Sequence, residues 1–510
     1  MNAAGYTHGV LLEVMTAPIT ASMLYNLVQC PKRLDLDLYG SPTLRDQVSP
    51  FVQMLWDRGS AYERQVMSSI GIKALDLSNA DIDDQEQLTL EAMRRHEPLI
   101  YSGRISASDL LGVPDLLRLS GDGYIPIDIK SGAAEESGDD LNDGKPKLHY
   151  AVQLGLYVDI LERLGLSAGR RGVILDVTGS EVTYYFDEPR GSRKSQTLWD
   201  EYQTRLTAAR SIVERSTPCL GALASVCKLC HWYTACSAEL RKADDLTLIP
   251  FLGRTIRDAM QREIATVAEL ASINPEHFIT GKKTVFPRLG PDRLRVFHER
   301  AKMLVDPEAK PILTAAIALP TSEVELFFDI EVDPMRDFTY LHGIVERRGG
   351  DSDGERFVAF FAEDETPAAE QQAFADAYAF LTADPTVTIW YYSKYERTIY
   401  RKLQARYPDV CSPDDIEQLF NPARTIDLYF DVVMKATEWP TNDHSIKTIA
   451  KYLGFSWRDN NPSGAASIEW FDHWVRTRDQ SVRQRILDYN EDDCRATRVL
   501  LDGIRALAND

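Results

Sequence analysis

The sequence lacks any long apolar run. No uninterrupted apolar stretch approaches the roughly 18 residues of a membrane span. Residues 1–14 lack the basic and apolar regions of a secretory signal and carry Glu13. The Gly-x4-Gly-Lys-Ser/Thr loop that cradles nucleotide phosphates is also missing. We therefore expect a cytoplasmic protein without a membrane span and without a built-in helicase motor.

Positive charge is scarce as well. The chain has 57 Lys and Arg against 77 Asp and Glu, a net charge of −20, which argues against a protein that coats nucleic acid non-specifically. Seven Cys in such a chain do not suggest a disulfide framework. With 510 residues, of which 44% are hydrophobic, the chain is long enough for two or three folded domains.

The stretch 113–130 is predicted to form two short strands joined by the Gly-Asp-Gly turn at 121–123. Asp115 begins the first strand. Asp128 and Lys130 end the second, and because they are two residues apart they share one face. Two carboxylates and an ammonium at one site suit metal-dependent phosphodiester hydrolysis. The competing interpretation is a surface hairpin with a salt bridge at its end.

Two predicted helices could add side chains to this site. The helix over 51–67 carries Glu63, a further acid, although helical glutamates are usually solvated. The helix over 149–164 carries Gln153 and Tyr157, which are four residues apart and share a face. Their functional interpretation is contact with a phosphate or orientation of the strand-end lysine, and the alternative is a half-exposed amphipathic helix.

Three cysteines are close in the sequence: Cys227, Cys230 and Cys236. A Cys-x2-Cys pair forms a natural chelate turn, and a third Cys gives three metal ligands. Cys30, in a helix predicted over 19–38, is the best fourth ligand, and Cys219 is its rival. Zinc and a 4Fe–4S cluster both suit four thiolates. The alternative is a set of structural thiols without metal.

Residues 19–241 resemble the RecB-like branch of the PD-(D/E)XK nuclease superfamily, and specifically its iron–sulfur members, which include CRISPR-associated spacer-processing nucleases and nuclease domains of helicase–nucleases. The matching residues are Glu63, Pro114-Asp115, Asp128-Ile129-Lys130, Gln153, Tyr157, Cys30, Cys227, Cys230 and Cys236. The resemblance implies metal ligation by Asp115 and Asp128, catalysis by Lys130 with Gln153 and Tyr157 beside it, and a 4Fe–4S cluster on the four cysteines. Many relatives have His where this chain has Glu63.

Residues 242–318 are predicted to form a helical linker. Two pieces, 249–253 and 286–290, each run into a helix and resemble helix-hairpin-helix elements, in which backbone N–H groups face a nucleic-acid phosphate. Three arginines would suit that surface: Arg293, Arg295 and Arg300. A plain helical linker is the alternative.

A further domain is predicted from about residue 319. Asp329 and Glu331 end an apolar strand on the same face, and Tyr489 and Asp493 lie four apart on the final helix. Such a set of acids suits two divalent cations, one activating water and one stabilising the leaving oxygen. The alternative is that each acid is simply exposed.

Residues 323–510 resemble the DEDD exonucleases of the ribonuclease H-like fold, in the subtype with a tyrosine in the third motif. The resemblance implies that Asp329, Glu331 and Asp493 bind Mg²⁺ or Mn²⁺ and that Tyr489 orients water. The second motif departs from the family, because Glu396 stands where an aspartate is usual, but a glutamate can still bind a metal and Glu396 is expected to join the metal ligands. Asp427 and Lys447 are further members of the site in a bacterial subgroup.

The whole arrangement resembles bacterial RecB-like nucleases that carry both halves in one chain. We expect a multidomain α/β (α+β) protein with a nuclease domain over 1–241, a linker over 242–318 and an exonuclease domain over 319–510. The expected substrate is DNA, at single-stranded or frayed ends, in repair, recombination or defence. The alternatives are a non-catalytic scaffold that partners a helicase or an integrase, and an RNA-directed nuclease.

Overall fold

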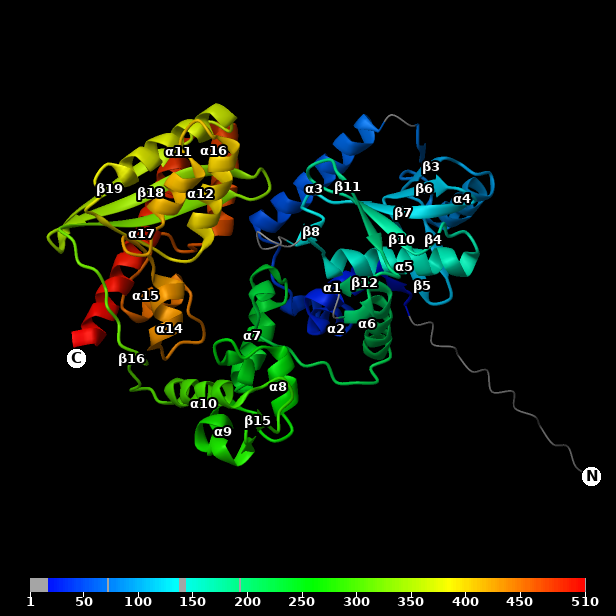
Figure 1. Cartoon of the computed structure of the whole chain (residues 1–510). Coiled ribbons are helices and arrows are strands. Elements are labelled where there is room, and N and C mark those ends of the chain that lie inside the picture. The colour runs from blue at the N-terminus through cyan, green and yellow to red at the C-terminus, as the bar shows by residue number, and fades with distance from the viewer. Residues whose placement is uncertain (1–16, 71–72, 137–143, 192–193, 510) are drawn as a thin grey trace, which may run out of the picture. The chain divides into compact units, whose positions relative to one another are not determined.

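The computed structural model describes residues 17–70, 73–136, 144–191 and 194–509 (Figure 1). They form two compact units, the first built mainly from residues up to Cys236 and the second from Ser237 onward. The predicted helical linker therefore belongs to the same unit as the C-terminal domain. Within the described ranges, no helix is both long enough and apolar enough to cross a bilayer.

The first unit is organised around a six-stranded sheet with the order β11-β10-β7-β6-β3-β2. Its strands are β2 (Leu75–Asp76), β3 (Leu99–Tyr101), β6 (Leu116–Ser120), β7 (Gly123–Ile129), β10 (Arg171–Leu175) and β11 (Glu181–Tyr185). The central strand β7 pairs antiparallel with β6 and parallel with β10. It is buried along its whole length, because helices cover both faces of the sheet.

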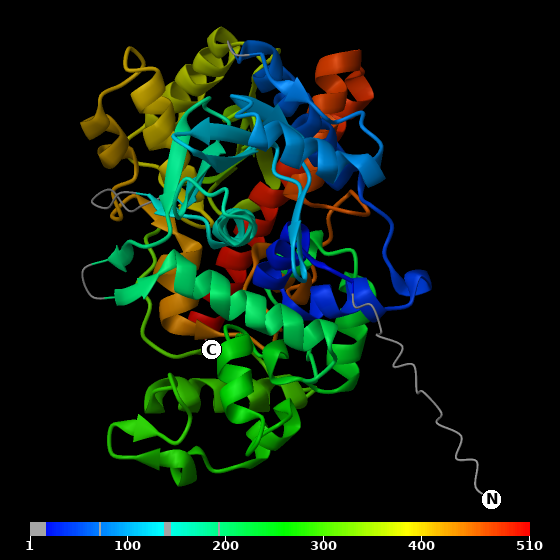
Figure 2. The same cartoon turned by 90° about the vertical axis from the view of Figure 1, so that its right-hand side faces the viewer.

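The two faces of this sheet carry separate hydrophobic cores, since successive strand residues point to opposite faces. On one face, α1 (Ala21–Gln29), α5 (Leu148–Leu164) and α6 (Leu198–Val213) pack together (Figure 2). On the other face, α3 (Pro50–Ser69) contributes Tyr62, Val66 and Met67 against Ile127 and Ile129 of β7.

The predicted hairpin at 113–130 is confirmed. Strands β6 and β7 pair with Ser120 opposite Gly123. Gly121 in the turn has a φ of +62°, a conformation that glycine adopts without steric cost. The turn and both strands follow from local sequence, and together they place Asp115 and Asp128 next to each other.

The single helix predicted over 19–38 is wrong. The structure has a short strand β1 (Ile19–Thr20), then α1, and a second helix α2 (Pro31–Tyr39). Cys30 between the two helices is extended, with φ −163° and ψ 118°. Pro31 causes the break, because proline lacks an N–H and disfavours helical backbone at the residue before it.

The first unit has further short elements. They are η1 (Pro42–Leu44), α4 (Ile82–Arg94), β4 (Ile105–Ala107), β5 (Leu110–Gly112), β8 (Glu135–Glu136), β9 (Lys145–Pro146), β12 (Pro189–Gly191), β13 (Lys194–Thr197), η2 (Ser225–Leu229) and the start of α7 (Tyr233–Lys242), whose residues from Ser237 onward belong to the second unit. Strands β1, β5 and β4 form a separate small sheet.

The second unit contains a five-stranded sheet with the order β19-β18-β17-β20-β21. Its strands are β17 (Val324–Asp333), β18 (Phe338–Arg348), β19 (Asp351–Phe361), β20 (Thr388–Tyr391) and β21 (Thr425–Asp427). The first three are antiparallel, whereas β20 runs parallel to both β17 and β21. In this order β17 is the central strand, with a neighbouring strand on each side.

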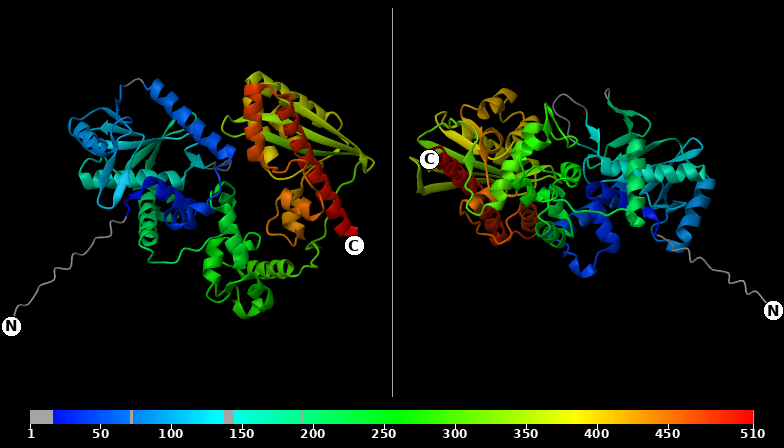
Figure 3. Two further views of the ribbon diagram at one scale, coloured as in Figure 1. Left: turned by 180° about the vertical axis from the view of Figure 1, so that it is seen from behind. Right: turned by 90° about the horizontal axis from the view of Figure 1, so that it is seen from below.

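Helices cover both faces of this sheet. On one face, α11 (Pro367–Thr382) and α12 (Tyr395–Arg406) pack on alternate residues of β17. On the other, the long helix α17 (Gln480–Asn509) packs across β17 and β18 (Figure 3). The end of β17 therefore meets side chains from helices on either side.

The remaining elements of the second unit include a helical part with its own core, formed by residues from 246 to 304. Its elements are η3 (Leu246–Leu248), α8 (Arg254–Met260), α9 (Val267–Ser272), η4 (Pro275–Phe278), β14 (Ile279–Thr280), β15 (Lys283–Thr284) and α10 (Pro291–Val305). The others are β16 (Ile312–Leu313), α13 (Pro413–Leu419), η5 (Leu428–Val433), α14 (Met434–Ala436), β22 (Thr437–Glu438), α15 (Ile446–Tyr452) and α16 (Gly464–Thr477).

Candidate active sites

The β6–β7 hairpin brings Asp115, Asp128 and Lys130 together, as predicted. Asp128 lies near the end of β7, almost completely buried, and its Oδ2 is 2.9 Å from Lys130 Nζ. Asp115 precedes β6, and its Oδ2 accepts a hydrogen bond of 2.6 Å from the backbone N–H of Ile129. The hairpin backbone therefore fixes one carboxylate, and strand periodicity aligns the other with the lysine.

Charge at this site is partly balanced. Burial raises the pKa of Asp115 to about 7, and Asp128 adds to the rise, whereas Lys130 and the N–H of Ile129 oppose it. Burial lowers the pKa of Lys130, but Asp128 and Asp115 outweigh that effect and raise it. The lysine is thus charged at neutral pH, and Asp115 titrates close to neutrality.

Glu63 from α3 faces the same place. Its Oε1 accepts a hydrogen bond of 2.8 Å from the Tyr101 hydroxyl. A pocket of about 650 Å³ is lined by Glu63, Asp115 and Lys130, with Trp56 among its other walls. Two of the acids and the lysine therefore border one solvent-accessible cavity, and the third acid, Asp128, is buried beside the lysine.

Gln153 and Tyr157, predicted to flank the site, have different positions. Gln153 lines the pocket, and its Oε1 is buried without a hydrogen-bond partner. Tyr157 lies one turn further along α5, where its hydroxyl donates to the carbonyl of Val113 at 3.4 Å. Its ring packs directly against Gly112, where the Cβ of any larger residue would lie only 2.6 Å from the ring. Tyr157 thus contacts the start of the hairpin within electrostatic range of Asp128 and Asp115, and Gln153 reaches the pocket.

Sequence reasoning missed two aromatic residues at this site. Tyr101 positions Glu63, and Tyr150 lines the pocket with its ring centroid 5.7 Å from Lys130 Nζ. Tyr150 lies three residues before Gln153 on α5, so helical spacing could have indicated it. No local pattern marks Tyr101, because its role depends on how α3 packs on the sheet.

Cysteines far apart in sequence approach one another in the first unit. Burial raises the pKa of the Cys230 thiol, and Cys227 and Cys30 raise it further, whereas a backbone N–H and Arg33 lower it. Cys227 and Cys230 share a turn, in which the Cys230 N–H donates to the Cys227 carbonyl at 3.1 Å. Cys236 follows in α7. The break at Pro31 thus leaves Cys30 within electrostatic range of the Cys-x2-Cys turn.

Polar and packing contacts hold this turn against α2. Asp37 Oδ1 accepts a hydrogen bond of 2.9 Å from the Trp232 indole and lies 2.6 Å from His231 Nε2. The Trp232 ring is so close to Gly40 that a Cβ there would be 2.9 Å away. The rival cysteine, Cys219, instead packs at the edge of the hydrophobic core.

In the second unit, Asp329, Glu331 and Asp493 form a tight acidic cluster. One ligand atom from each lies within 4.8 Å of the other two, and among the described residues this is the one group of three potential metal ligands that approaches so closely. Strand periodicity puts Asp329 and Glu331 on one face of β17, and α17 supplies Asp493.

These carboxylates are poorly compensated. Burial raises the pKa of Asp329 well above its usual value, and Asp493 and Glu331 add to the rise. Burial, followed by Asp493, raises the pKa of Glu331 to about 8. Lys447 opposes both shifts without cancelling them. The cluster therefore strongly favours a bound cation.

Lys447 of α15 links two of the predicted residues on α17. Its Nζ donates to the Tyr489 hydroxyl at 2.6 Å and to Asp493 Oδ2 at 3.4 Å. The other carboxylate oxygen of Asp493 accepts a hydrogen bond of 2.7 Å from the Trp457 indole. Burial raises the pKa of Tyr489 well above its usual value, so the phenol is neutral. Asp493 is thus oriented from two sides.

Asn490 is a site residue that sequence reasoning missed. Its Nδ2 donates to Asp329 Oδ2 at 2.7 Å, and its Oδ1 is buried without a partner. The amide fits because residue 343 is glycine, where a Cβ would lie 1.6 Å from Asn490 Oδ1. Neighbouring helical residues do not share a face in general, so the proximity of Asn490 to Tyr489 in sequence gave no signal.

Comparison with protein-family models matches residues 39–237 to the PD-(D/E)XK nuclease superfamily and residues 326–504 to the RNase H superfamily. The chain joins two nuclease-superfamily domains. No curated protein matches the chain. The predicted α/β multidomain fold with these two domains is confirmed. The PD-(D/E)XK match includes the hairpin and the three late cysteines, and Cys30 precedes it.

Two further predicted acids of the RNase H domain lie behind the tight cluster. Glu396, in the first turn of α12, is buried with Oε2 unpartnered, and its charge raises the pKa of Asp329. Asp427 Oδ1 accepts hydrogen bonds from three backbone N–H groups and caps η5, whereas its Oδ2 is buried without a partner. Neither acid belongs to the group within 4.8 Å.

The predicted arginine surface of the helical part is largely wrong. Arg300 is buried and makes a two-bond ion pair with Glu438, both bonds being 2.7 Å. Arg295 is paired with Glu276 at 2.7 Å. Arg293 alone of the three is exposed without an ion pair in the described structure. The helical part therefore uses Arg300 to pack on the RNase H domain.

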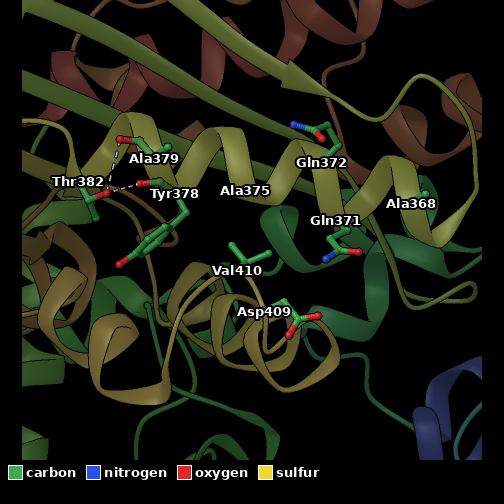
Figure 4. Close-up of a pocket in the computed structure, with 9 residues that line it drawn as sticks. All are labelled: Ala368, Gln371, Gln372, Ala375, Tyr378, Ala379, Thr382, Asp409 and Val410. Carbon is green, nitrogen blue, oxygen red and sulfur yellow. Dashed lines mark hydrogen bonds between the residues drawn. The ribbon is translucent and has the colours of Figure 1, made fainter.

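A second cavity of the RNase H domain has no comparable chemistry. It measures about 850 Å³ and runs along α11, with Asp409 as the one carboxylate among its lining residues (Figure 4). The Thr382 hydroxyl bonds back to the carbonyl of Tyr378 in its own helix (Figure 4). Alanines, two glutamines, Tyr378, Thr382 and Val410 form the rest of the wall, so we assign no reaction to it.

Proposed function

We propose that this protein is a divalent-metal-dependent nuclease that hydrolyses DNA phosphodiester bonds at single-stranded or frayed ends. Both of its domains belong to superfamilies of nucleases. The observation that carries the proposal is the cluster of Asp329, Glu331 and Asp493, one half-buried and two buried carboxylates that converge within 4.8 Å. Such a concentration of buried negative charge is costly without a cation.

The donor sets fit Mg²⁺ or Mn²⁺, which prefer carboxylate oxygens. In the RNase H domain the candidates are Asp329, Glu331 and Asp493, with Glu396 and Asp427 behind them. In the PD-(D/E)XK domain they are Asp115, Asp128 and Glu63. A bound divalent cation supplies an activated water and neutralises charge that develops on the phosphate.

The chain's own residues supply the remaining functions. Lys130, kept charged by its two aspartates, neutralises charge on a phosphate oxygen. Gln153 offers an unpartnered carbonyl oxygen to a water in the pocket. In the RNase H domain, the Tyr489 oxygen accepts from Lys447 and its hydroxyl also hydrogen-bonds Asp493, so the phenol is held beside the acidic cluster, where it can orient a water or a phosphate oxygen. Tyr157 supports the start of the hairpin beside the two aspartates.

We also propose a structural 4Fe–4S cluster on Cys30, Cys227, Cys230 and Cys236. Four thiolates are the usual ligand set for such a cluster, and the contacts of Asp37 with Trp232 and His231 hold the late cysteines against α2. The cluster would join the start of the PD-(D/E)XK domain to its end. Brown protein with about four irons per chain is expected, whereas colourless protein with stoichiometric zinc after anaerobic purification would refute it.

A RecB-like role with a helicase or an integrase in trans fits a chain that lacks a nucleotide-binding loop. The nuclease would then process ends that a partner exposes during repair, recombination or defence. One observation favours a second candidate: Glu396 replaces the usual aspartate of the DEDD pattern, which is consistent with an RNase H domain that binds strands without cutting them.

The test is cleavage of end-labelled single-stranded DNA, duplex DNA and matched RNA with magnesium, manganese or chelator. Asp128→Asn, Asp329→Asn and the double variant are compared with Asp292→Asn, whose side chain is fully exposed. We expect each single variant to lose one activity, the double variant to lose all cleavage and the control to lose none. Metal-dependent cleavage by the double variant would refute the proposal. Loss in Asp128→Asn alone would favour the non-cutting RNase H domain.

A further inference from the structure

The helical part of the second unit contains the same seven-residue turn twice. Residues 247–253 read Thr-Leu-Ile-Pro-Phe-Leu-Gly, and residues 284–290 read Thr-Val-Phe-Pro-Arg-Leu-Gly. In both copies the fifth residue has a left-handed backbone, with φ of 66° at Phe251 and 64° at Arg288. In both, the leucine at the sixth position is buried and the glycine at the seventh precedes a helix. The copies therefore share one backbone shape and differ in the side chain at its tip.

The first copy is used for packing on the RNase H domain. The carbonyl of Leu248 accepts a hydrogen bond of 3.0 Å from Asn442 Nδ2. The Phe251 ring lies 5.2 Å from the His444 ring, and the Arg300 guanidinium lies 5.0 Å from Phe251. Phenylalanine at the tip thus fixes the helical part to the segment that leads into α15, the helix of the site lysine Lys447.

The second copy has arginine at its tip and is attached to a basic hairpin. Thr284 joins the hairpin β14–β15 to the turn, because its hydroxyl donates to the Leu289 carbonyl at 2.6 Å and accepts from the Phe286 N–H at 3.1 Å. The rings of Phe278 and Phe286 also stack at 5.2 Å. The hairpin and the turn therefore form one rigid surface, near β15 and α10 in Figure 1.

Four cations on this surface form what we term the basic turn: Lys282, Lys283, Arg288 and Arg293. All four are exposed, and within the described structure none of them makes an ion pair. Several other cations of the helical part are ion-paired, for example Arg295 with Glu276 and Lys302 with Glu299. Four uncompensated charges contrast with a chain whose net charge is −20.

We propose that the basic turn binds the phosphate backbone of the nucleic acid on which the RNase H domain acts. Exposed Lys and Arg without acidic partners gain affinity for phosphates by releasing counterions, and they do so without reading sequence. A mostly acidic surface repels a polyanion elsewhere, so the strand is held where the charge is positive. The inference rests on the proposed function for the identity of the ligand.

The experiment measures binding without cleavage. Fluorescence anisotropy follows a labelled single-stranded DNA oligonucleotide with the full chain in EDTA over a range of salt concentrations. Lys283→Gln with Arg288→Gln removes two charges of the basic turn. Arg295→Gln with Lys302→Gln removes two exposed but ion-paired charges from the same helical part and serves as the matched control.

We expect the basic-turn variant to lower the slope of log affinity against log salt by about 1.4, since each phosphate contact on a single strand contributes about 0.7. Its affinity should fall at low salt and converge with wild type at high salt, and the control should keep the wild-type slope. An unchanged slope and affinity in the basic-turn variant would overturn the inference. The same result is expected if the basic turn contacts an acidic protein instead of nucleic acid.

Binding and cleavage fail separately. A wild-type chain that binds through the basic turn in EDTA but never cleaves with metal would refute the nuclease proposal and support this inference. Metal-dependent cleavage together with an unchanged salt slope in the basic-turn variant would support the nuclease proposal and refute this inference.

Discussion

Glu331→Gln is predicted to stabilise the second unit in the absence of metal. Burial, followed by Asp493, raises the pKa of Glu331 from 4.5 to about 8. Because the pKa of Glu331 is higher in the fold than in the unfolded chain, the wild type has its full free energy of unfolding below pH 4.5. It loses part of that free energy as the pH rises toward 8. At about 1.36 kcal/mol per pH unit, this shift costs the wild-type fold about 3 kcal/mol at pH 7 and less than about 1 kcal/mol at pH 5, because Glu331 ionises in the unfolded chain but stays largely protonated in the fold. Glutamine keeps the shape and never ionises.

The assay is urea unfolding in EDTA at pH 5 and pH 7, followed by tryptophan fluorescence. Five of the eight tryptophans lie in the second unit, so the signal reports mainly on it: Trp390, Trp439, Trp457, Trp470 and Trp474. We expect the variant to exceed wild type by up to about 3 kcal/mol at pH 7 and to match it at pH 5. Manganese at about 100 times its dissociation constant should add about 2.7 kcal/mol to wild type and much less to the variant.

Glu299→Gln, which removes an exposed carboxylate paired with Lys302, is the control and should show no pH-dependent difference from wild type. The reasoning would be refuted by a wild-type stability that stays flat between pH 5 and pH 7 in EDTA. It would also be refuted by a Glu331→Gln variant that is less stable than wild type at pH 7.

Three more substitutions test separate parts of the structure. Lys130→Ala should reduce cleavage by the PD-(D/E)XK domain by about 10²-fold or more, measured in an RNase H-inactive background. Gly343→Ala should cost about 1–3 kcal/mol and raise the metal concentration for half-maximal cleavage, because its Cβ would lie 1.6 Å from Asn490 Oδ1. Gly40→Ala should lower the iron content per chain, because its Cβ would be 2.9 Å from the Trp232 ring.

Features that depend on short-range pattern could be predicted from the sequence. The hairpin over 113–130 was predictable because a glycine turn and two alternating strands define it locally. The pairing of Asp128 with Lys130 followed from strand periodicity alone, and so did the common face of Asp329 and Glu331. Each of these predictions needs only a period of two residues.

Features that depend on packing between distant segments could not be predicted. Asn490 reaches Asp329 because strand pairing sets Gly343 opposite Asp329, so that α17 approaches the sheet where no Cβ intervenes. Tyr101 meets Glu63 only through the packing of α3. Arg300 is predicted from the sequence to be a surface cation. In the structure it is buried in an ion pair with Glu438, a residue 138 positions further along the chain.

The helix predicted over 19–38 is wrong for a different reason, because the signal that contradicts it is local. Proline at position 31 marks a helix start, and the residue before a proline disfavours helical backbone. Cys30 is that residue, and its extended backbone separates α1 from α2. The same break presents Cys30 toward the Cys-x2-Cys turn, so the irregularity and the thiol cluster have one cause.

The two acidic sites share a spacing but differ in charge balance. Asp-x-Lys on β7 carries its own cation, so Asp128 lies 2.9 Å from an ammonium even without metal. Asp-x-Glu on β17 has a second carboxylate in that position, and both acids have strongly raised pKa values. The same two-residue spacing therefore yields one site that is partly neutralised by the chain and one whose carboxylates the chain leaves largely uncompensated. It follows that metal binding should be coupled to folding much more strongly in the RNase H domain than in the PD-(D/E)XK domain.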